Sequence, residues 1–274
     1  MANTGQAAIR LPMARAGRDS WRRAVETFGP YVTIGSLLVA WEVAARMELV
    51  IPFLLPALST VVVRIGEDVV SGAFFYNLAL TMYRALLAFG IAAVAGVAIG
   101  IMMARSKTVR WFFDPLVSIG LPMPKIALLP VFMLWFGLFD ASKIAMVAFS
   151  AVFQIIATTW AATRAVEKEL IWSARSLGAS ERQILREIVL PAALPQIMTG
   201  LQIAMPICLI VVLVTEMVMG GRGLGDAMLT AARYAQTPGV FAGIVEIAVT
   251  GFCIIKAMEL IRRRLLRWHA EAAR

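Results

Sequence analysis

The chain has 274 residues, of which 60% are hydrophobic and only 16% are charged, and its mean hydropathy is +0.80. Soluble domains carry about 25% charged residues, so this composition excludes both a water-soluble domain and a disordered chain. The formal net charge of +9 does not indicate a nucleic-acid partner, because the basic residues cluster between apolar stretches, as in membrane proteins. Two cysteines within apolar runs exclude a disulfide scaffold, and a single histidine, His269, excludes a multi-histidine metal site.

The first apolar stretch, residues 31–50, follows a basic amino-terminal segment, residues 1–30. A helix needs about 20 predominantly apolar residues to cross a bilayer. The stretch is long enough, but Glu42 lies near its middle, so we expect this carboxylate to face other helices. We expect no cleaved signal peptide, because the stretch begins late and can itself span. Beyond it, Ser59 is the expected N-cap of a short amphipathic helix outside the membrane.

Five further stretches complete the predicted membrane domain, residues 31–274. Three of them carry no charge and one carries Glu246, while the stretch 111–139 contains four prolines and predicts an interfacial segment followed by a short, kinked span. In chain order the stretches are 85–104, 111–139, 144–163, 197–215 and 240–261. The sequence therefore predicts an all-α polytopic protein with six transmembrane helices in the lipid bilayer.

The distribution of Lys and Arg predicts the orientation of these helices. Of the 26 basic residues, 18 fall on one side, within segments 10–23, 105–110, 164–186 and 262–274. Five fall on the other side, namely Arg46, Arg64, Lys143, Arg222 and Arg233. Because cytoplasmic loops carry the excess of basic residues, we expect both termini to be cytoplasmic.

The cytoplasmic loop of about residues 164–195 is long and has helical patterning. One amphipathic helix is expected over residues 167–177, and Gly178 follows at the position where helices close in a left-handed conformation. Ser180 with Gln183 forms a capping-box pattern for a second helix, which Pro191 is expected to end. This helix–glycine–helix loop, called the elbow below, is either an interfacial hairpin on the membrane surface or a docking element for a soluble partner.

Ionisable residues within spans are costly unless they face the bundle interior or a cavity. Four candidates for a translocation pathway or gate follow from this rule: Glu216, Glu42, Glu246 and Arg84. Glu42 and Glu246 can instead satisfy a neighbouring helix, and Arg84 can simply extend its guanidinium to the interface. The glycine-rich run 220–225 is interpreted as a flexible outer turn, and Gly96 with Gly100 as a site of close helix packing.

The elbow resembles the conserved loop of binding-protein-dependent ABC importer permeases, often called the EAA loop. The stretch SARSLGASERQILREIVLPAALP, residues 173–195, carries this resemblance. Its matching positions are Ala174, Gly178, Ile188, Leu190 and Pro191, whereas Trp172 and Ser173 stand where the motif has Glu and Ala. The runs IPFLLPALS, PMPKIALLPVFMLWFGLFDASKI, GGRGLG and RRRLLRW are similar to the nitrate/sulfonate/taurine/bicarbonate permease subfamily.

This resemblance implies a type I ABC importer permease fold with six helices in the bacterial inner membrane. It implies a second permease copy, most simply as a homodimer, two cytoplasmic ATP-binding subunits and an extracytoplasmic solute-binding protein. The chain has no phosphate-binding G-x-x-x-x-G-K-[ST] sequence, so ATP is expected to bind elsewhere and the chain is expected to be no enzyme and to need no cofactor or metal. The implied solute is a small anion.

On this interpretation the elbow contacts the ATPase subunit. The residues expected to couple ATP hydrolysis to transport are Leu170, Trp172, Ala174, Arg175, Leu177, Gly178, Ala179, Arg182, Ile184, Ile188, Leu190 and Pro191. The apolar members should dock in a groove of the ATPase, with Arg175 and Arg182 at its rim. A self-contained ion-coupled transporter or channel, which would not need the elbow, is the alternative. A membrane enzyme is the other alternative, but it would need converging acids, bases or metal ligands, whereas this sequence has isolated acids and a single histidine.

Overall fold

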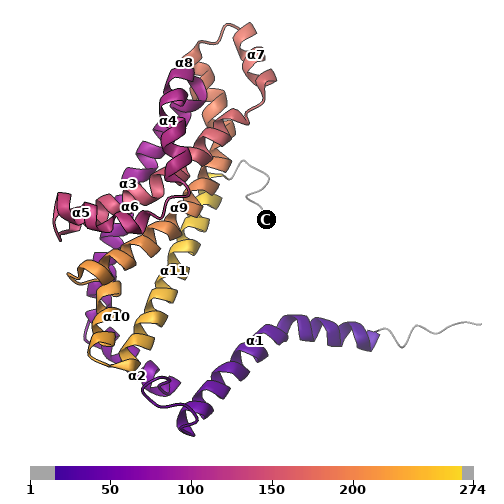
Figure 1. The fold of residues 1–274 in the computed structure, drawn as a ribbon. Coiled ribbons are helices and arrows are strands. Elements are labelled where there is room, and N and C mark those ends of the chain that lie inside the picture. Colours follow the sequence, from indigo (N-terminus) through magenta and orange to yellow (C-terminus); the bar gives the residue numbers. More distant parts are fainter. Residues whose placement is uncertain (1–15, 267–274) are drawn as a thin grey trace, which may run out of the picture. The chain divides into compact units, whose positions relative to one another are not determined.

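The computed structural model describes residues 16–266, and every regular element within them is a helix (Figure 1). This confirms the predicted all-α fold class. The helices in chain order are α1 (Ala16–Arg46), α2 (Leu58–Val70), α3 (Ala73–Arg105), α4 (Lys107–Gly120), the 3-10 turn η1 (Lys125–Leu128), α5 (Leu129–Phe136), α6 (Asp140–Arg164), α7 (Lys168–Ser176), α8 (Glu181–Gln183), the π turn η2 (Ile184–Val189), α9 (Leu190–Met219), α10 (Leu224–Arg233) and α11 (Thr237–Leu265). Residues 1–15 of the predicted basic segment, and His269 in the tail, lie outside the described residues.

The chain divides into two compact units after Val62. In the first unit, Glu42 on α1 accepts hydrogen bonds from Arg46 Nε at 2.6 Å and from the backbone N–H of Ser59 at 3.1 Å. Ser59 was expected to be the N-cap of the following helix, but that helix begins at Leu58. The side chain of Ser59 instead donates to Glu42 at 2.9 Å, so its hydroxyl stabilises the carboxylate rather than a free N–H of its own helix.

The second unit is a bundle in which α6 packs between α3 and α9, and α10 and α11 pack against α9. Small residues allow the close approach of α3 to α6. A Cβ at Gly96 would lie 2.7 Å from Ile155 Cγ2, and a Cβ at Gly100 would lie 2.6 Å from Thr159 Cβ. Both distances are shorter than van der Waals contact, so the predicted role of this glycine pair in helix packing is confirmed.

Four helices of the second unit are long and apolar enough to cross a membrane: α3, α6, the continuous helix over residues 181–219, and α11. The pair formed by α4 and the segment Lys125–Phe136 is bent by 98° and counts as a fifth crossing only if the two parts act together. Helix α5 has 8 residues and is therefore about 12 Å long, too short to cross alone. The predicted interruption of this stretch is confirmed, whereas the expected count of six is reached only by adding α1 as well.

The second helix of the elbow does not end at Pro191, contrary to expectation. From Glu181 the chain continues through η2 into α9 without a break, and Pro191 lies in the first turn of α9. The π turn explains this continuity, because its i→i+5 bonds, such as Leu190 N–H to Leu185 O, widen the helix where the proline ring would otherwise clash. The second helix of the elbow is therefore continuous with a membrane span.

Candidate functional site

A buried ion pair joins α3 to α9 near the carboxyl end of α9, far along the continuous helix that begins at Glu181 in the elbow. The guanidinium of Arg84 is 2.6 Å from Glu216 Oε1, and the side chains of both residues are almost fully buried, at 2% and 0% exposure. Thr81, one helical turn before Arg84, places its hydroxyl 2.9 Å and 3.0 Å from the two carboxylate oxygens. The backbone N–H of Gly225 donates to the second oxygen at 3.1 Å. The charge of Glu216 is therefore fully compensated by protein partners.

The glycine-rich run 220–225 is a cap over this ion pair, not the flexible turn that the sequence suggested. Arg84 donates to the backbone carbonyls of Arg222 at 2.8 Å and Gly221 at 3.0 Å. Gly223 has a φ of +116°, and a Cβ at this residue would overlap the carboxylate of Glu216. Glycine is required here by both backbone conformation and space. Arg84 does not extend to the interface as expected, because its donors are used within the protein.

Two charged residues at the start of α6 complete the network, and sequence reasoning missed their role. Asp140 accepts from Arg84 Nε at 2.8 Å, and the buried Lys143 donates to the carbonyl of Gly220. With Arg84 and Glu216 they form a set of two cations and two anions, so the network is electrically balanced. The sequence signal for this role was the position of Asp140 and Lys143 directly before an apolar span. From the sequence alone, Lys143 is instead expected to be an exposed cation on the outer side.

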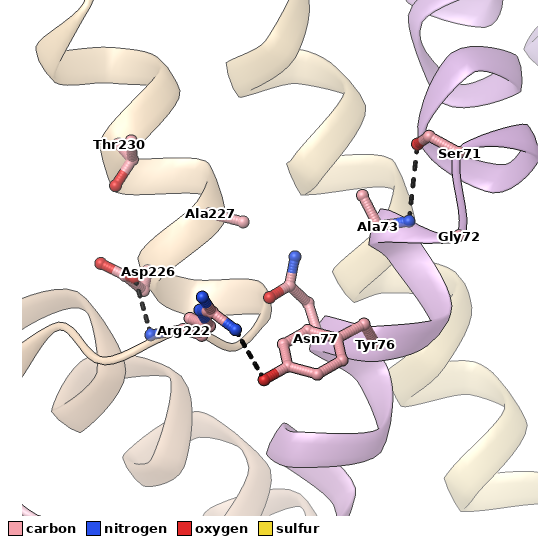
Figure 2. Close-up of a pocket in the computed structure, with 9 residues that line it drawn as sticks. All are labelled: Ser71, Gly72, Ala73, Tyr76, Asn77, Arg222, Asp226, Ala227 and Thr230. Atoms are coloured by element: carbon pink, nitrogen blue, oxygen red, sulfur yellow. Dashed lines mark hydrogen bonds between the residues drawn. The ribbon is translucent and has the colours of Figure 1, made fainter.

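A pocket of about 400 Å³ lies beside this cap, between the start of α3 and the first half of α10, and Figure 2 shows the side chains that line it. Arg222 donates from its guanidinium to the hydroxyl of Tyr76 at 2.9 Å, and its backbone N–H donates to Asp226 at 2.9 Å. Asn77 accepts from the backbone N–H of Gly223 at 3.1 Å. Arg222 is exposed and lines the pocket, with its guanidinium held by Tyr76 of α3 and its backbone held by Asp226 of α10.

The four predicted pathway residues are divided between the two units. Arg84 and Glu216 bind each other, whereas Glu42 belongs to the first unit, where it pairs with Arg46. Glu246 lies on α11, is 8% exposed and lines a separate cavity. The role of these residues in transport stays a prediction.

The elbow has the local geometry that the sequence predicted. Gly178 follows α7 with a φ of +84°, and a Cβ placed on it would meet nothing within 4 Å. Ser180 Oγ accepts from the backbone N–H of Gln183, and the side chain of Gln183 accepts from the backbone N–H of Ser180, which is a complete capping box. Arg175 and Arg105 both pair with Glu181, at 2.6 Å and 2.9 Å, and so fasten α7 and the end of α3 to the second helix.

The apolar side chains of the elbow divide into exposed and buried sets. Trp172 is 58% exposed and Leu177 is 86% exposed, and Leu170 is exposed as well. Ile184, which was expected to dock on the ATPase, is only 2% exposed. Its side chain is buried within the permease itself, so it does not belong to an exposed docking surface.

Comparison with known proteins identifies the family. Residues 96–267 match the family described as the binding-protein-dependent transport system inner membrane component. The chain belongs to this family. It is a transmembrane permease subunit of an ABC importer, a multi-pass integral membrane protein, and permeases of this family work with ATPase and substrate-binding partners.

Similar proteins support the same assignment over most of the permease. The chain is 32% identical to the taurine transport system permease protein TauC of Escherichia coli K12, over 87% of this chain and 89% of that one. It is 33% identical to the putative aliphatic sulfonates transport permease protein SsuC of Bacillus subtilis 168, over 85% and 84%. A solved amino acid ABC transporter with histidines shares the fold with a TM-score of 0.59 and 20% identity, covering 73% of this chain and 97% of that chain.

Proposed function

We propose that this permease carries a small sulfonate or a similar anion into the cytoplasm, and that its elbow transmits ATPase movement to the membrane helices. The observation that carries the second part is the exposure of Trp172 and Leu177 on a capped, charge-fastened elbow. Large apolar side chains held on a rigid support suit a protein–protein interface, where aromatic anchors supply most of the binding energy. Each elbow in a homodimer would dock on one of two ATP-binding subunits.

A pair of substitutions at Gly178 tests the coupling role. Valine is β-branched and strongly disfavours a φ of +84°, whereas asparagine tolerates this conformation, and a Cβ at this position meets nothing within 4 Å. We expect Gly178→Val to insert and dimerise normally but to bind the ATPase weakly or to uncouple ATP hydrolysis from uptake. We expect Gly178→Asn to retain coupling. The measurements are co-purification of the ATPase, ATP turnover and solute uptake in the same proteoliposomes.

Two results would contradict this part of the proposal. Wild-type uptake per ATP in Gly178→Val would make the elbow a surface hairpin without a coupling role. Uptake by the purified permease alone, without an ATPase subunit, would favour the alternative of a self-contained transporter or channel.

The sulfonate assignment is supported by the named substrates of the two relatives and by Arg222 at the outer pocket (Figure 2). An exposed guanidinium beside a tyrosine hydroxyl suits the three oxygens of a sulfonate, because arginine presents several donors in a fixed fork. In proteoliposomes containing the binding protein and ATPase, we expect uptake of labelled taurine or ethanesulfonate. Uptake of neither solute, with ATP turnover intact, would refute the assignment.

We further propose that the network of Arg84, Glu216, Asp140 and Lys143 holds the outer gate closed by fixing the cap to α3 and α6. The burial of Arg84, Lys143 and Glu216 and the balanced charges of the four residues support this role. We also propose that the permease lies in the bacterial inner membrane with both termini on the cytoplasmic side. In this orientation the elbow faces the ATPase and the cap faces outward. We expect Glu216→Gln to assemble normally but to lower uptake or raise solute leakage, and unchanged transport would make the network purely structural.

A further inference from the structure

A second cavity, of about 230 Å³, lies in the second unit between the later turns of α2 and helices α3, α10 and α11. Its walls are partly apolar, formed by side chains such as Phe74 and Met228 and by the backbone at Gly239 and Gly243. The polar groups lining it are Arg64, Asp68, Asn77, Thr230, Gln236 and Glu246. Of these six groups, Asn77 and Thr230 also line the pocket described above. None of the six belongs to the network of Arg84, Glu216, Asp140 and Lys143.

Glu246 is the unusual member of this set. Its side chain is more than nine-tenths buried, and among the described residues no donor contacts its Oε1 atom. A buried carboxylate oxygen without a donor is costly, so such a group indicates a missing partner. Because Glu246 lines the cavity, a partner bound there can lie beside its carboxylate.

The charges around the cavity specify the sign of the missing partner. Arg64 donates from Nε to Asp68 at 3.0 Å, and this hydrogen bond, assisted by the nearby carboxylate of Glu246, raises the pKa of the guanidinium above its ordinary value. Arg64 and Asp68 neutralise each other, and Glu246 is the remaining charge. The cavity is therefore short of one positive charge and at least one hydrogen-bond donor.

The cavity fits an organic cation better than a metal ion. Hard metal ions require about six oxygen ligands at short distance, whereas here Asp68 is engaged by Arg64 and one carboxylate remains. The volume of 230 Å³ also exceeds what a bare ion fills, and the apolar walls suit methylene groups. A primary ammonium offers three donors and a single charge. We propose that this cavity binds a primary ammonium group on a short carbon chain, with Glu246 as its counter-charge.

The amine can belong to the carried solute or to a separate small molecule. If it belongs to the solute, the permease distinguishes amino-sulfonates from simple sulfonates, and this extension rests on the proposed function. The proposal that the cavity binds an amine does not rest on the proposed function, because the binding of an amine can be measured without transport.

The first experiment measures amine binding to the purified permease–ATPase complex. Ethylammonium chloride is titrated against sodium chloride at equal ionic strength, and the midpoint of thermal unfolding is followed, since a ligand that binds only the folded state raises it. We expect ethylammonium to stabilise the wild type and its affinity to fall about tenfold or more in Glu246→Gln, the effect of losing one charged hydrogen bond. Glu259→Gln is the matched control, because Glu259 lies on the same helix but pairs with Lys256 and Arg263.

Equal stabilisation of the wild type and Glu246→Gln, or equal stabilisation by the sodium salt, would overturn the proposal. Normal yield and unfolding of Glu246→Gln without added amine show that it folds. The conservative variant Glu246→Asp, which keeps the charge, should retain part of the ethylammonium response.

The second experiment identifies the source of the amine. Uptake of taurine and of ethanesulfonate, which lacks the ammonium, is compared in proteoliposomes with the same binding protein and ATPase. A fall of about tenfold in the taurine-to-ethanesulfonate ratio in Glu246→Gln, absent in Glu259→Gln, assigns the amine to the solute. An unchanged ratio together with Glu246-dependent ethylammonium binding assigns it to a separate amine. Uptake of neither solute by the wild type refutes the sulfonate assignment, while ethylammonium binding still decides the cavity.

Discussion

Removal of Arg84 and removal of the Glu216 charge should be energetically coupled, so that the double variant loses less stability than the two single variants together. In Arg84→Met the Glu216 carboxylate keeps the Thr81 hydroxyl and the Gly225 N–H but loses the guanidinium at 2.6 Å. Removing one member of a fully buried ion pair costs about 3–5 kcal/mol, because the other charge remains in an environment that cannot solvate it. Arg84 also donates to Asp140 and to the cap carbonyls, which favours the upper end of this range.

The second substitution, Glu216→Gln, removes the stranded charge while keeping an oxygen for Thr81 or Gly225. The double variant should therefore be less destabilised than the sum of the single variants, by about 2 kcal/mol or more. The assay is denaturant-induced unfolding of the purified permease in detergent, followed by tryptophan fluorescence. Arg105→Met, which breaks the exposed pair with Glu181, is the control and should cost about 1 kcal/mol or less. Single-variant effects that add within about 0.5 kcal/mol would refute a coupled buried pair.

Two further predictions concern helix packing and topology. Gly100→Leu should abolish stable assembly, because the new side chain would overlap Thr159. Gly90→Leu on the same helix should be tolerated, because a Cβ there meets nothing within 4 Å. Equal expression and equal unfolding midpoints of the two variants would contradict the packing argument. In a cysteine-free background, an impermeant thiol reagent applied to intact cells should label Arg222→Cys and not Arg18→Cys, and the reverse pattern would invert the proposed orientation.

Features that depend on neighbouring residues could be predicted from the sequence. The left-handed Gly178 and the capping box of Ser180 with Gln183 each involve residues within three positions of each other, so their geometry follows from local chemistry. The close approach at Gly96 and Gly100 follows from the absence of a side chain on one helical face. The turn and cap of the elbow could therefore be predicted, whereas its continuation past Pro191 and the burial of Ile184 could not.

Features that depend on distant partners could not be predicted. Arg84 and Glu216 are 132 positions apart, and a rule for single spans can only say that each needs some partner. Lys143 looked like an ordinary outer-side cation because its acceptor is a backbone carbonyl, that of Gly220, which leaves no mark in the sequence. Ile184 fits the apolar face of a surface helix equally well in the sequence, and only the tertiary structure shows that its side chain is buried.

The unbroken helix from Glu181 to Met219 has a mechanical consequence for transport. Glu216 follows Glu181 by 35 positions, which corresponds to about 50 Å at 1.5 Å per residue. A tilt of only about 5° at the elbow would displace the far end of such a rod by about 4 Å, more than the length of the hydrogen bonds that hold Glu216. The rod can yield at the π turn and at the two prolines within α9, Pro195 and Pro206, so these three points determine how much of a cytoplasmic stroke reaches the outer surface.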